Sequence, residues 1–129
     1  MAKKLNIICT FDLTEEQRKR IQGVSDQVRL VVIPAAKPED IPQARWENAD
    51  VLYTWNVLPS PETAPNLKWV QFNSAGMDRF LDHPLLQKPD LVATTMSGVI
   101  TGQIAEYVLM AMLAFGQQLP KLNRLKAAH

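Results

Sequence analysis

Short apolar segments alternate along the chain with segments whose apolar residues recur at helical spacing. Apolar segments rich in β-branched or aromatic residues predict five strands, at residues 5–10, 28–33, 50–54, 68–72 and 91–94. The segments between and after them predict helices at residues 15–23, 39–48, 76–84 and 102–119. Thr14 and Gln17 have the spacing of a capping box at the start of the first helix, and Gly23 suits its C-terminal end.

The strand segments are continuous apolar runs, which is typical of strands buried on both faces of a parallel sheet. Because helices alternate with these strands, the pattern predicts an α/β fold: a doubly wound, parallel five-stranded sheet with a long C-terminal helix. We expect one domain over residues 1–129, with a core over about 1–100. Ligands of such sheets bind at the carboxyl ends of the strands.

The helix over residues 102–119 is apolar around most of its circumference. Its longest uninterrupted apolar run, from Tyr107 to Phe115, has nine residues. A membrane-spanning helix needs roughly 20, so we expect no membrane insertion. A helix that is apolar on all sides is normally buried on all sides. The sequence therefore predicts that a further domain or a second copy of the chain, in a homodimer, covers this helix.

Charge and cysteine content exclude several classes of partner. Fourteen Lys and Arg against thirteen Asp and Glu leave a net charge of +1, so nothing favours binding to nucleic acid or to an anionic membrane. Cys9 is the one cysteine, which excludes an internal disulfide and a zinc site built from several cysteines. We expect Cys9 to be buried and inert. The first residues lack the apolar segment of a secretory signal, and a cytoplasmic location is expected.

Residues 73–78 follow the fourth strand and contain the candidate ligand site. Free backbone amides at a turn of this kind, with Gly76 allowing close approach, suit a carboxylate or a single phosphate. An ordinary strand–turn–helix with Ser74 as the cap is the open alternative. Trp55 and Asn56 follow the third strand and are candidates for the same cleft, although packing and turn roles explain them equally well.

Other nucleotide and catalytic motifs are absent from the sequence. The five glycines, at positions 23, 76, 98, 102 and 116, form no dinucleotide fingerprint. Gln103 stands where a phosphate-binding loop would have lysine. His83 in a turn and His129 at the terminus offer no acid–base pair, so no catalytic residue is predicted. Thr10 and Asp12 lie near the same sheet edge, where capping is their expected role.

Two stretches resemble the D-isomer-specific 2-hydroxyacid dehydrogenases. The first is LKWVQFNSAGMD at residues 67–78, and the second combines TTMSGV at 94–99 with IAEYVL at 104–109. The first 65 residues agree with the family only in pattern. The resemblance implies the flavodoxin-like substrate-binding domain of an NAD(P)-dependent enzyme that reversibly reduces 2-oxo acids.

The resemblance also implies roles for particular residues. The backbone amides of Ala75 and Gly76 would hold the substrate carboxylate. Ser74 and Met77 would belong to the same substrate-binding turn, and Trp55 and Asn56 would flank the substrate. Thr101 would lie on the cofactor side. The helix over 102–119 would cross into an NAD-binding domain that, like the catalytic Arg, Glu and His of the family, is missing from this sequence. We therefore expect an incomplete enzyme, inactive alone. The alternative is a free-standing module that binds small carboxylates or pairs with itself.

Overall fold

The computed structural model describes residues 4–128. Residues 1–3, which belong to the segment examined for a secretory signal, and His129 lie outside the described part. The chain divides into two compact units, of which the first ends at Met96 and the second begins at Ser97.

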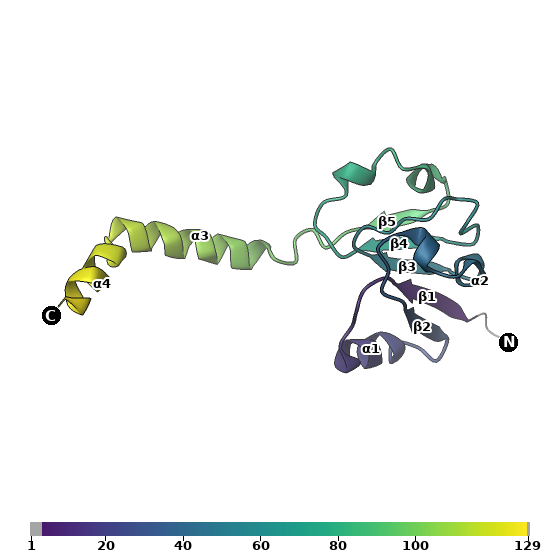
Figure 1. Cartoon of the computed structure of the whole chain (residues 1–129), viewed down its shortest axis with the longest axis horizontal. Coiled ribbons are helices and arrows are strands. Elements are labelled where there is room, and N and C mark those ends of the chain that lie inside the picture. Colours follow the sequence, from purple (N-terminus) through teal and green to yellow (C-terminus); the bar gives the residue numbers. More distant parts are fainter. Residues whose placement is uncertain (1–3, 129) are drawn as a thin grey trace. The chain divides into compact units, whose positions relative to one another are not determined.

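The first unit is built on five parallel strands (Figure 1). Their bounds are β1, Leu5–Cys9; β2, Val28–Val32; β3, Val51–Thr54; β4, Trp69–Phe72; and β5, Val92–Thr94. The order across the sheet is β2-β1-β3-β4-β5, which is the flavodoxin-like order. All pairings are parallel, with Ile7 opposite Val51 and Val51 opposite Trp69. The predicted fold class and all five strands are confirmed.

Helical segments connect the strands, and the first follows the prediction closely. Helix α1, Glu15–Gln22, has the expected capping box: the Gln17 amide donates to the Thr14 hydroxyl, and the Thr14 amide donates to the Gln17 side chain. Gly23 ends this helix in a right-handed conformation, with φ −73°, so the left-handed C-terminal glycine typical of many helices is not used here.

The next two predicted helices are shorter than expected. Residues 39–48 form a 3₁₀ turn η1, Pro38–Asp40, and a short helix α2, Gln43–Glu47, because Pro42 cannot continue the turn before it. Instead of one helix over 76–84 there are two 3₁₀ turns, η2, Asp78–Phe80, and η3, Pro84–Gln87. Pro84 holds the preceding His83 in an extended conformation, which interrupts any helix at that point.

The hydrophobic core lies on one face of the sheet. Ile8, Leu52 and Val70 project from neighbouring strands into a cluster with Trp46 of α2 and Leu85 of η3. All five are at most 3% exposed. The Trp46 indole N–H donates to the Pro38 carbonyl at 3.0 Å, so the largest core side chain leaves no buried donor unpaired.

The opposite face of the sheet is less completely covered. Helix α1 packs beside β2 on this side (Figure 1), and it is only eight residues long, about 12 Å. Trp69 of β4 and Val92 of β5 therefore remain 41% and 57% exposed. The expectation that every strand is buried on both faces is wrong for this half of the sheet.

The second unit contains two helices, α3, Thr101–Gly116, and α4, Leu119–Ala127. The long helix predicted over 102–119 is present as α3, but it ends at Gly116 and a second helix follows. The ring of Pro120 would clash with the carbonyl of Gly116 in a continuous helix, and Gln118 turns the chain in a left-handed conformation with φ 53°. Arg124 and Lys126 lie in the last turn of α4, where positive charge suits the helix dipole.

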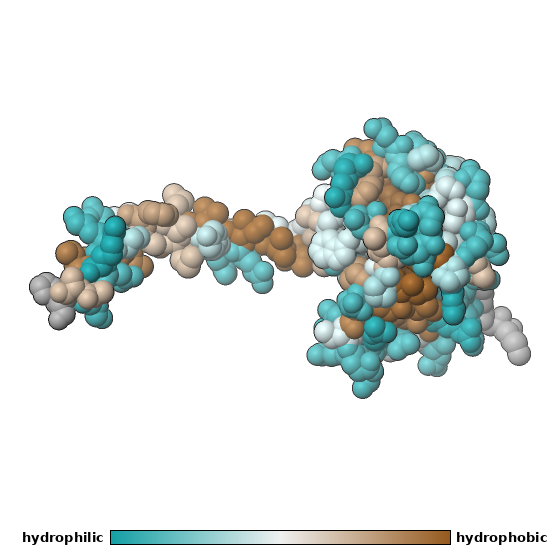
Figure 2. Space-filling view, viewed as in Figure 1, coloured by the Kyte–Doolittle hydropathy of each residue, from teal (hydrophilic) through white to brown (hydrophobic). Residues whose placement is uncertain are grey.

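Helix α3 is apolar around its circumference, as predicted, and none of its residues is buried. Figure 2 shows apolar atoms along its visible side. Leu109, Leu113 and Phe115 are 59%, 66% and 76% exposed. Within residues 4–128, no helix is both long and apolar enough to cross a membrane.

Candidate functional site

The predicted ligand residues of the first unit follow two adjacent strands. Trp55 and Asn56 come directly after β3, residues 74–77 come shortly after β4, and β3 pairs with β4 in parallel. Their loops therefore leave the sheet at the same edge, the carboxyl edge that was predicted. Trp55 is 47% exposed and Asn56 is also exposed, so both are accessible to a ligand.

A buried pair of hydroxyl groups anchors the loop after β3. Thr10 and Thr54 are 5% and 0% exposed, and their Oγ1 atoms lie 2.7 Å apart. The Thr54 hydroxyl also accepts a hydrogen bond from the Val57 amide at 3.0 Å. Thr10, considered for capping or ligand contact, thus serves to fix the chain on either side of Trp55 and Asn56.

The turn at residues 74–77 differs from the predicted cap. The Ser74 hydroxyl donates to the Gly76 carbonyl at 2.8 Å, and the Ser74 carbonyl accepts from the Met96 amide at 2.8 Å. The first helical residue is Asp78, so Ser74 does not cap a helix at Gly76. In the part of the chain that the structure describes, the Ala75 and Gly76 amides donate to no other residue.

Asp78 places a negative charge beside this turn. A Cβ atom added to Gly76 would lie 3.2 Å from the Asp78 Oδ2 atom, and both residues are exposed. The turn η2 that follows has three residues, too few for the dipole of an α-helix to build up. Any attraction of the turn for an anion therefore comes from its free amides, and the Asp78 carboxylate opposes it by repulsion.

Three further side chains connect the two loops. The sequence analysis did not identify Phe11 and Tyr53, and it included Asn73 in the candidate segment without assigning it a role. The Tyr53 hydroxyl donates to the Asn73 Oδ1 atom at 2.8 Å. The Phe11 ring meets Tyr53 edge-on at 4.8 Å between centroids and approaches Trp55 at 6.0 Å. Burial raises the pKa of the Tyr53 hydroxyl above its ordinary value, which further favours the protonated, donating form.

A sequence signal existed for each of these residues. Phe11 and Asn73 stand just beyond the ends of β1 and β4, at the edge where ligands bind. Tyr53 is on the same face of β3 as Val51, two residues earlier, and this is the face away from the main core. What the sequence could not supply is the pairing of Tyr53 with Asn73, which are 20 residues apart.

A separate hollow of about 350 Å³ lies between α1 and β3. It is lined by Leu13, Gln17, Arg20, Ile21, Val24 and Tyr53. Tyr53 therefore lines this hollow and also bonds to Asn73 at the carboxyl edge. None of the predicted ligand residues lines the hollow.

The remaining candidates belong to other elements than the loops after β3 and β4. Thr101 is exposed and begins α3 in the second unit. His83 caps η3, because its Nδ1 atom accepts from the Leu85 amide at 3.2 Å. Cys9 is fully buried, as expected; its thiol donates to the Phe11 carbonyl at 3.3 Å, and burial raises its pKa.

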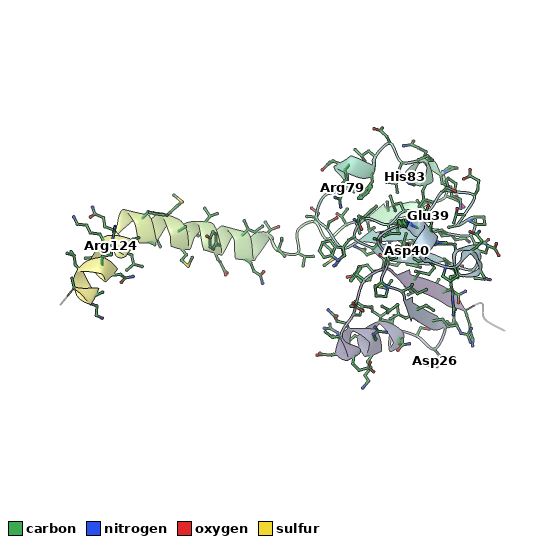
Figure 3. The ribbon with its side chains drawn as sticks, viewed as in Figure 1. Asp26, Glu39, Asp40, Arg79, His83 and Arg124 are labelled. Carbon is green, nitrogen blue, oxygen red and sulfur yellow. The ribbon has the colours of Figure 1, made fainter. Side chains whose placement is uncertain are left out.

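Titratable side chains do not gather into a metal centre. Among residues 4–128 no group of three or more His, Cys, Asp and Glu is arranged to hold a metal ion. Figure 3 shows Glu39 and Asp40 on η1 and Arg79 on η2, each in a different part of the first unit from Asp26.

The described residues also do not fit NAD. A dinucleotide needs a glycine-rich turn between a strand and a helix, with amides directed at the pyrophosphate. The turn after β4 has the single glycine Gly76, a three-residue 3₁₀ turn and the Asp78 carboxylate, which would repel a pyrophosphate.

These features define the class of the first unit: a flavodoxin-like α/β domain whose polar and aromatic loops meet at the carboxyl edge of a parallel sheet. No protein-family model matches the sequence, and no curated protein sequence matches it. Solved structures do match, and those described next are D-2-hydroxyacid dehydrogenases.

Phosphoglycerate dehydrogenase from Lactobacillus plantarum matches with a TM-score of 0.57 and 28% identity, over 85% of this chain and 34% of that one. D-Lactate dehydrogenase from Aquifex aeolicus, solved with NAD and lactic acid, matches with a TM-score of 0.61 and 16% identity. That match covers 92% of this chain and 38% of the other, so the chain spans little more than a third of either dehydrogenase. The resemblance inferred from the sequence is confirmed as a structural match, and the domain is related to the substrate-binding domain of these enzymes.

Proposed function

We propose that this chain is the substrate-binding domain of an NAD(P)-dependent D-2-hydroxyacid dehydrogenase. In this proposal its ligand is a small 2-oxo or 2-hydroxy acid, bound by its carboxylate at residues 74–77. The observation that carries the proposal is the pair of free, exposed amides at Ala75 and Gly76, on the sheet edge where such ligands bind. Ser74 and Met77 complete the turn, and Trp55 and Asn56 flank it.

In this proposal hydride transfer uses groups of another domain. NAD or NADP would bind to a separate domain, with Thr101 on the cofactor side, and the catalytic Arg, Glu and His would come from that domain. The exposed apolar surface of α3 supports contact with such a domain or with a second copy of the chain. A cytoplasmic location belongs to the same proposal, supported by a buried cysteine in the thiol form.

Carboxylate binding is tested by NMR titration of the ¹⁵N-labelled chain with sodium glyoxylate, against sodium chloride at equal ionic strength. We expect the Ala75 and Gly76 amides to shift first. Two amides without a cationic partner should give an affinity of about 1 mM, near 4 kcal/mol. If these two amides stay still while others shift, the site is elsewhere.

A glycine variant separates specific binding from general attraction. Gly76→Val places a branched side chain against the Asp78 carboxylate and over the turn, and we expect it to abolish the shifts. Gly102→Val is the matched control, because a Cβ atom there meets nothing within 4 Å. Equal binding by Gly76→Val and the unmodified chain would contradict the proposed site.

Dependence on a cofactor domain is tested by following NADH oxidation at 340 nm with glyoxylate. We expect the chain alone to give the rate of a heat-inactivated sample. Oxidation that scales with protein concentration would refute the proposal that cofactor and catalytic groups lie on another domain.

A further inference from the structure

Asn73 is a polar residue of the carboxyl edge that is held by two hydrogen bonds and still has one donor group free. Its backbone amide donates to the Thr54 carbonyl at 2.7 Å, which ties it to the end of β3. Its side-chain oxygen accepts from the Tyr53 hydroxyl at 2.8 Å. Its side-chain NH₂ group, Nδ2, donates to no other residue in the described part of the chain.

This NH₂ group is accessible to solvent. Asn73 is half-buried, and among the described residues no buried side-chain nitrogen or oxygen lacks a hydrogen-bond partner. An unpaired Nδ2 must therefore reach the surface. Because Oδ1 is held by Tyr53, the carboxamide is oriented with its oxygen toward the sheet and its donors outward.

The partner of Asn73 is itself held in place. The Phe11 ring packs edge-on against the Tyr53 ring at 4.8 Å, which limits rotation of the Tyr53 side chain. A hydroxyl that donates fixes which end of a carboxamide faces it, because only the oxygen can accept. Tyr53 thus acts on the orientation of Asn73 and not on a ligand.

The ligand of the turn needs more donors than two amides supply. A carboxylate has about four acceptor positions on its two oxygens, and a 2-oxo or 2-hydroxy group adds another oxygen. Asn73 precedes Ala75 by two residues at the same sheet edge. Its side chain is neutral, so it can donate a hydrogen bond to the ligand and, unlike a cationic side chain, would not form an ion pair with Asp78.

The geometry points to Asn73 as a ligand-binding residue that donates from Nδ2 to an oxygen of the acid held by Ala75 and Gly76, with Tyr53 as its positioning residue. This inference rests on the proposed function, because it requires that a carboxylate binds at the turn. It adds a side-chain contact to a site otherwise made of backbone.

The test uses the glyoxylate titration and follows the Asn73 side-chain NH₂ resonances together with the Ala75 and Gly76 amides. We expect all of them to shift with one affinity. If the two backbone amides shift and the Asn73 NH₂ pair does not, the inference is overturned while the proposed function stands. If none of them shifts, the proposed function fails and this inference fails with it.

Two variants separate a ligand contact from a structural role, because both remove the Tyr53–Asn73 hydrogen bond and only one removes the donor. Asn73→Ala should weaken glyoxylate binding by about tenfold, the effect of one hydrogen bond to a charged group. Tyr53→Phe keeps the NH₂ group and loses only its orientation, so its effect should be smaller, about two- to threefold.

Equal weakening by Asn73→Ala and Tyr53→Phe would show that the hydrogen bond between them matters only for the fold, and would overturn the inference. Tyr107→Phe on α3 is the matched control for the tyrosine change and should bind glyoxylate as the unmodified chain does. If Asn73→Ala does not fold, the NH₂ shifts of the unmodified chain decide the question alone.

Discussion

Replacement of Thr54 by valine removes the hydroxyl that joins β1 to the loop after β3. Valine has a similar volume, so the change leaves almost no cavity. Two groups lose their partner: the Val57 amide, in a residue 1% exposed, and the Thr10 hydroxyl, in a residue 5% exposed. Each buried unpaired group costs about 1–3 kcal/mol, so we expect Thr54→Val to lower the free energy of unfolding by roughly 2–6 kcal/mol.

The partner variant Thr10→Val gives an internal comparison. In this variant the Thr54 hydroxyl still accepts a hydrogen bond from the Val57 amide. Only the hydrogen bond between the two hydroxyl groups is lost. The expected loss is about 1–3 kcal/mol. Because the residues are in direct contact, the double variant should cost less than the sum of the two single variants.

Urea unfolding followed by tryptophan fluorescence measures all three variants against the unmodified chain. The midpoint should fall while the slope stays constant, since the change alters stability and not the surface exposed on unfolding. The reasoning is refuted if Thr10→Val destabilises as much as Thr54→Val, or if the two effects are additive. Equal losses would mean that the Val57 amide does not depend on the Thr54 hydroxyl, and additive losses would mean that the two hydroxyls do not stabilise one another.

Three further predictions concern charge, assembly and pH. Asp78→Asn should tighten glyoxylate binding a few-fold in the NMR titration, because it removes a carboxylate beside Gly76 and such exposed charge effects are about 0.2–1 kcal/mol. The chain should form a homodimer through α3, because burying each exposed leucine would contribute roughly 1.5–3 kcal/mol. The double variant Leu109→Glu and Leu113→Glu should be monomeric by light scattering. The Cys9 thiol of the unfolded chain ionises at about pH 8.5, whereas burial raises its pKa in the folded chain. The free energy of unfolding should therefore fall as the pH rises from about 8.5 to the raised pKa of the folded state.

Each of these predictions has a control or an outcome that contradicts it. Asp90→Asn, away from the turn, should leave the glyoxylate affinity unchanged, and an equal gain there would indicate a general charge effect. Gln103→Glu adds charge to α3 without touching the two leucines and should keep the dimer; a clean monomer of the unmodified chain at high micromolar concentration would rule the dimer out. Cys9→Ala should flatten the alkaline loss of stability, and an unchanged pH profile would assign that loss to other groups.

The sheet could be predicted from the sequence because each strand is a local apolar run with its own boundaries. The turns could not, because tertiary contacts decide them. Pro84 marks where a helix over 76–84 must end, but no local feature before it distinguishes an α-helix from the 3₁₀ turn η2. In the structure Phe80 of this turn stacks on Phe72, with ring centroids 5.3 Å apart. The break between α3 and α4 at Gln118 could have been predicted from the sequence, because Pro120 cannot continue the preceding helix.

The candidate site shows the same division. Its location at the carboxyl edge follows from strand direction alone, and the free amides of Ala75 and Gly76 follow from a glycine turn after a strand. The Tyr53–Asn73 and Thr10–Thr54 hydrogen bonds join residues 20 and 44 positions apart. No local pattern contains such pairs, because only the register of the sheet brings them together.

The span of the core has a consequence for how the chain folds as it is synthesised. Its buried cluster begins at Ile8 and is completed only by Leu85 of η3. A nascent chain therefore keeps the inner faces of β1 and β3 unpacked until residue 85 of 129 has left the ribosome. The named members of that cluster all precede Met96, so we expect the first unit to fold before α4 has left the ribosome, and its unpaired strand edges to need protection until then.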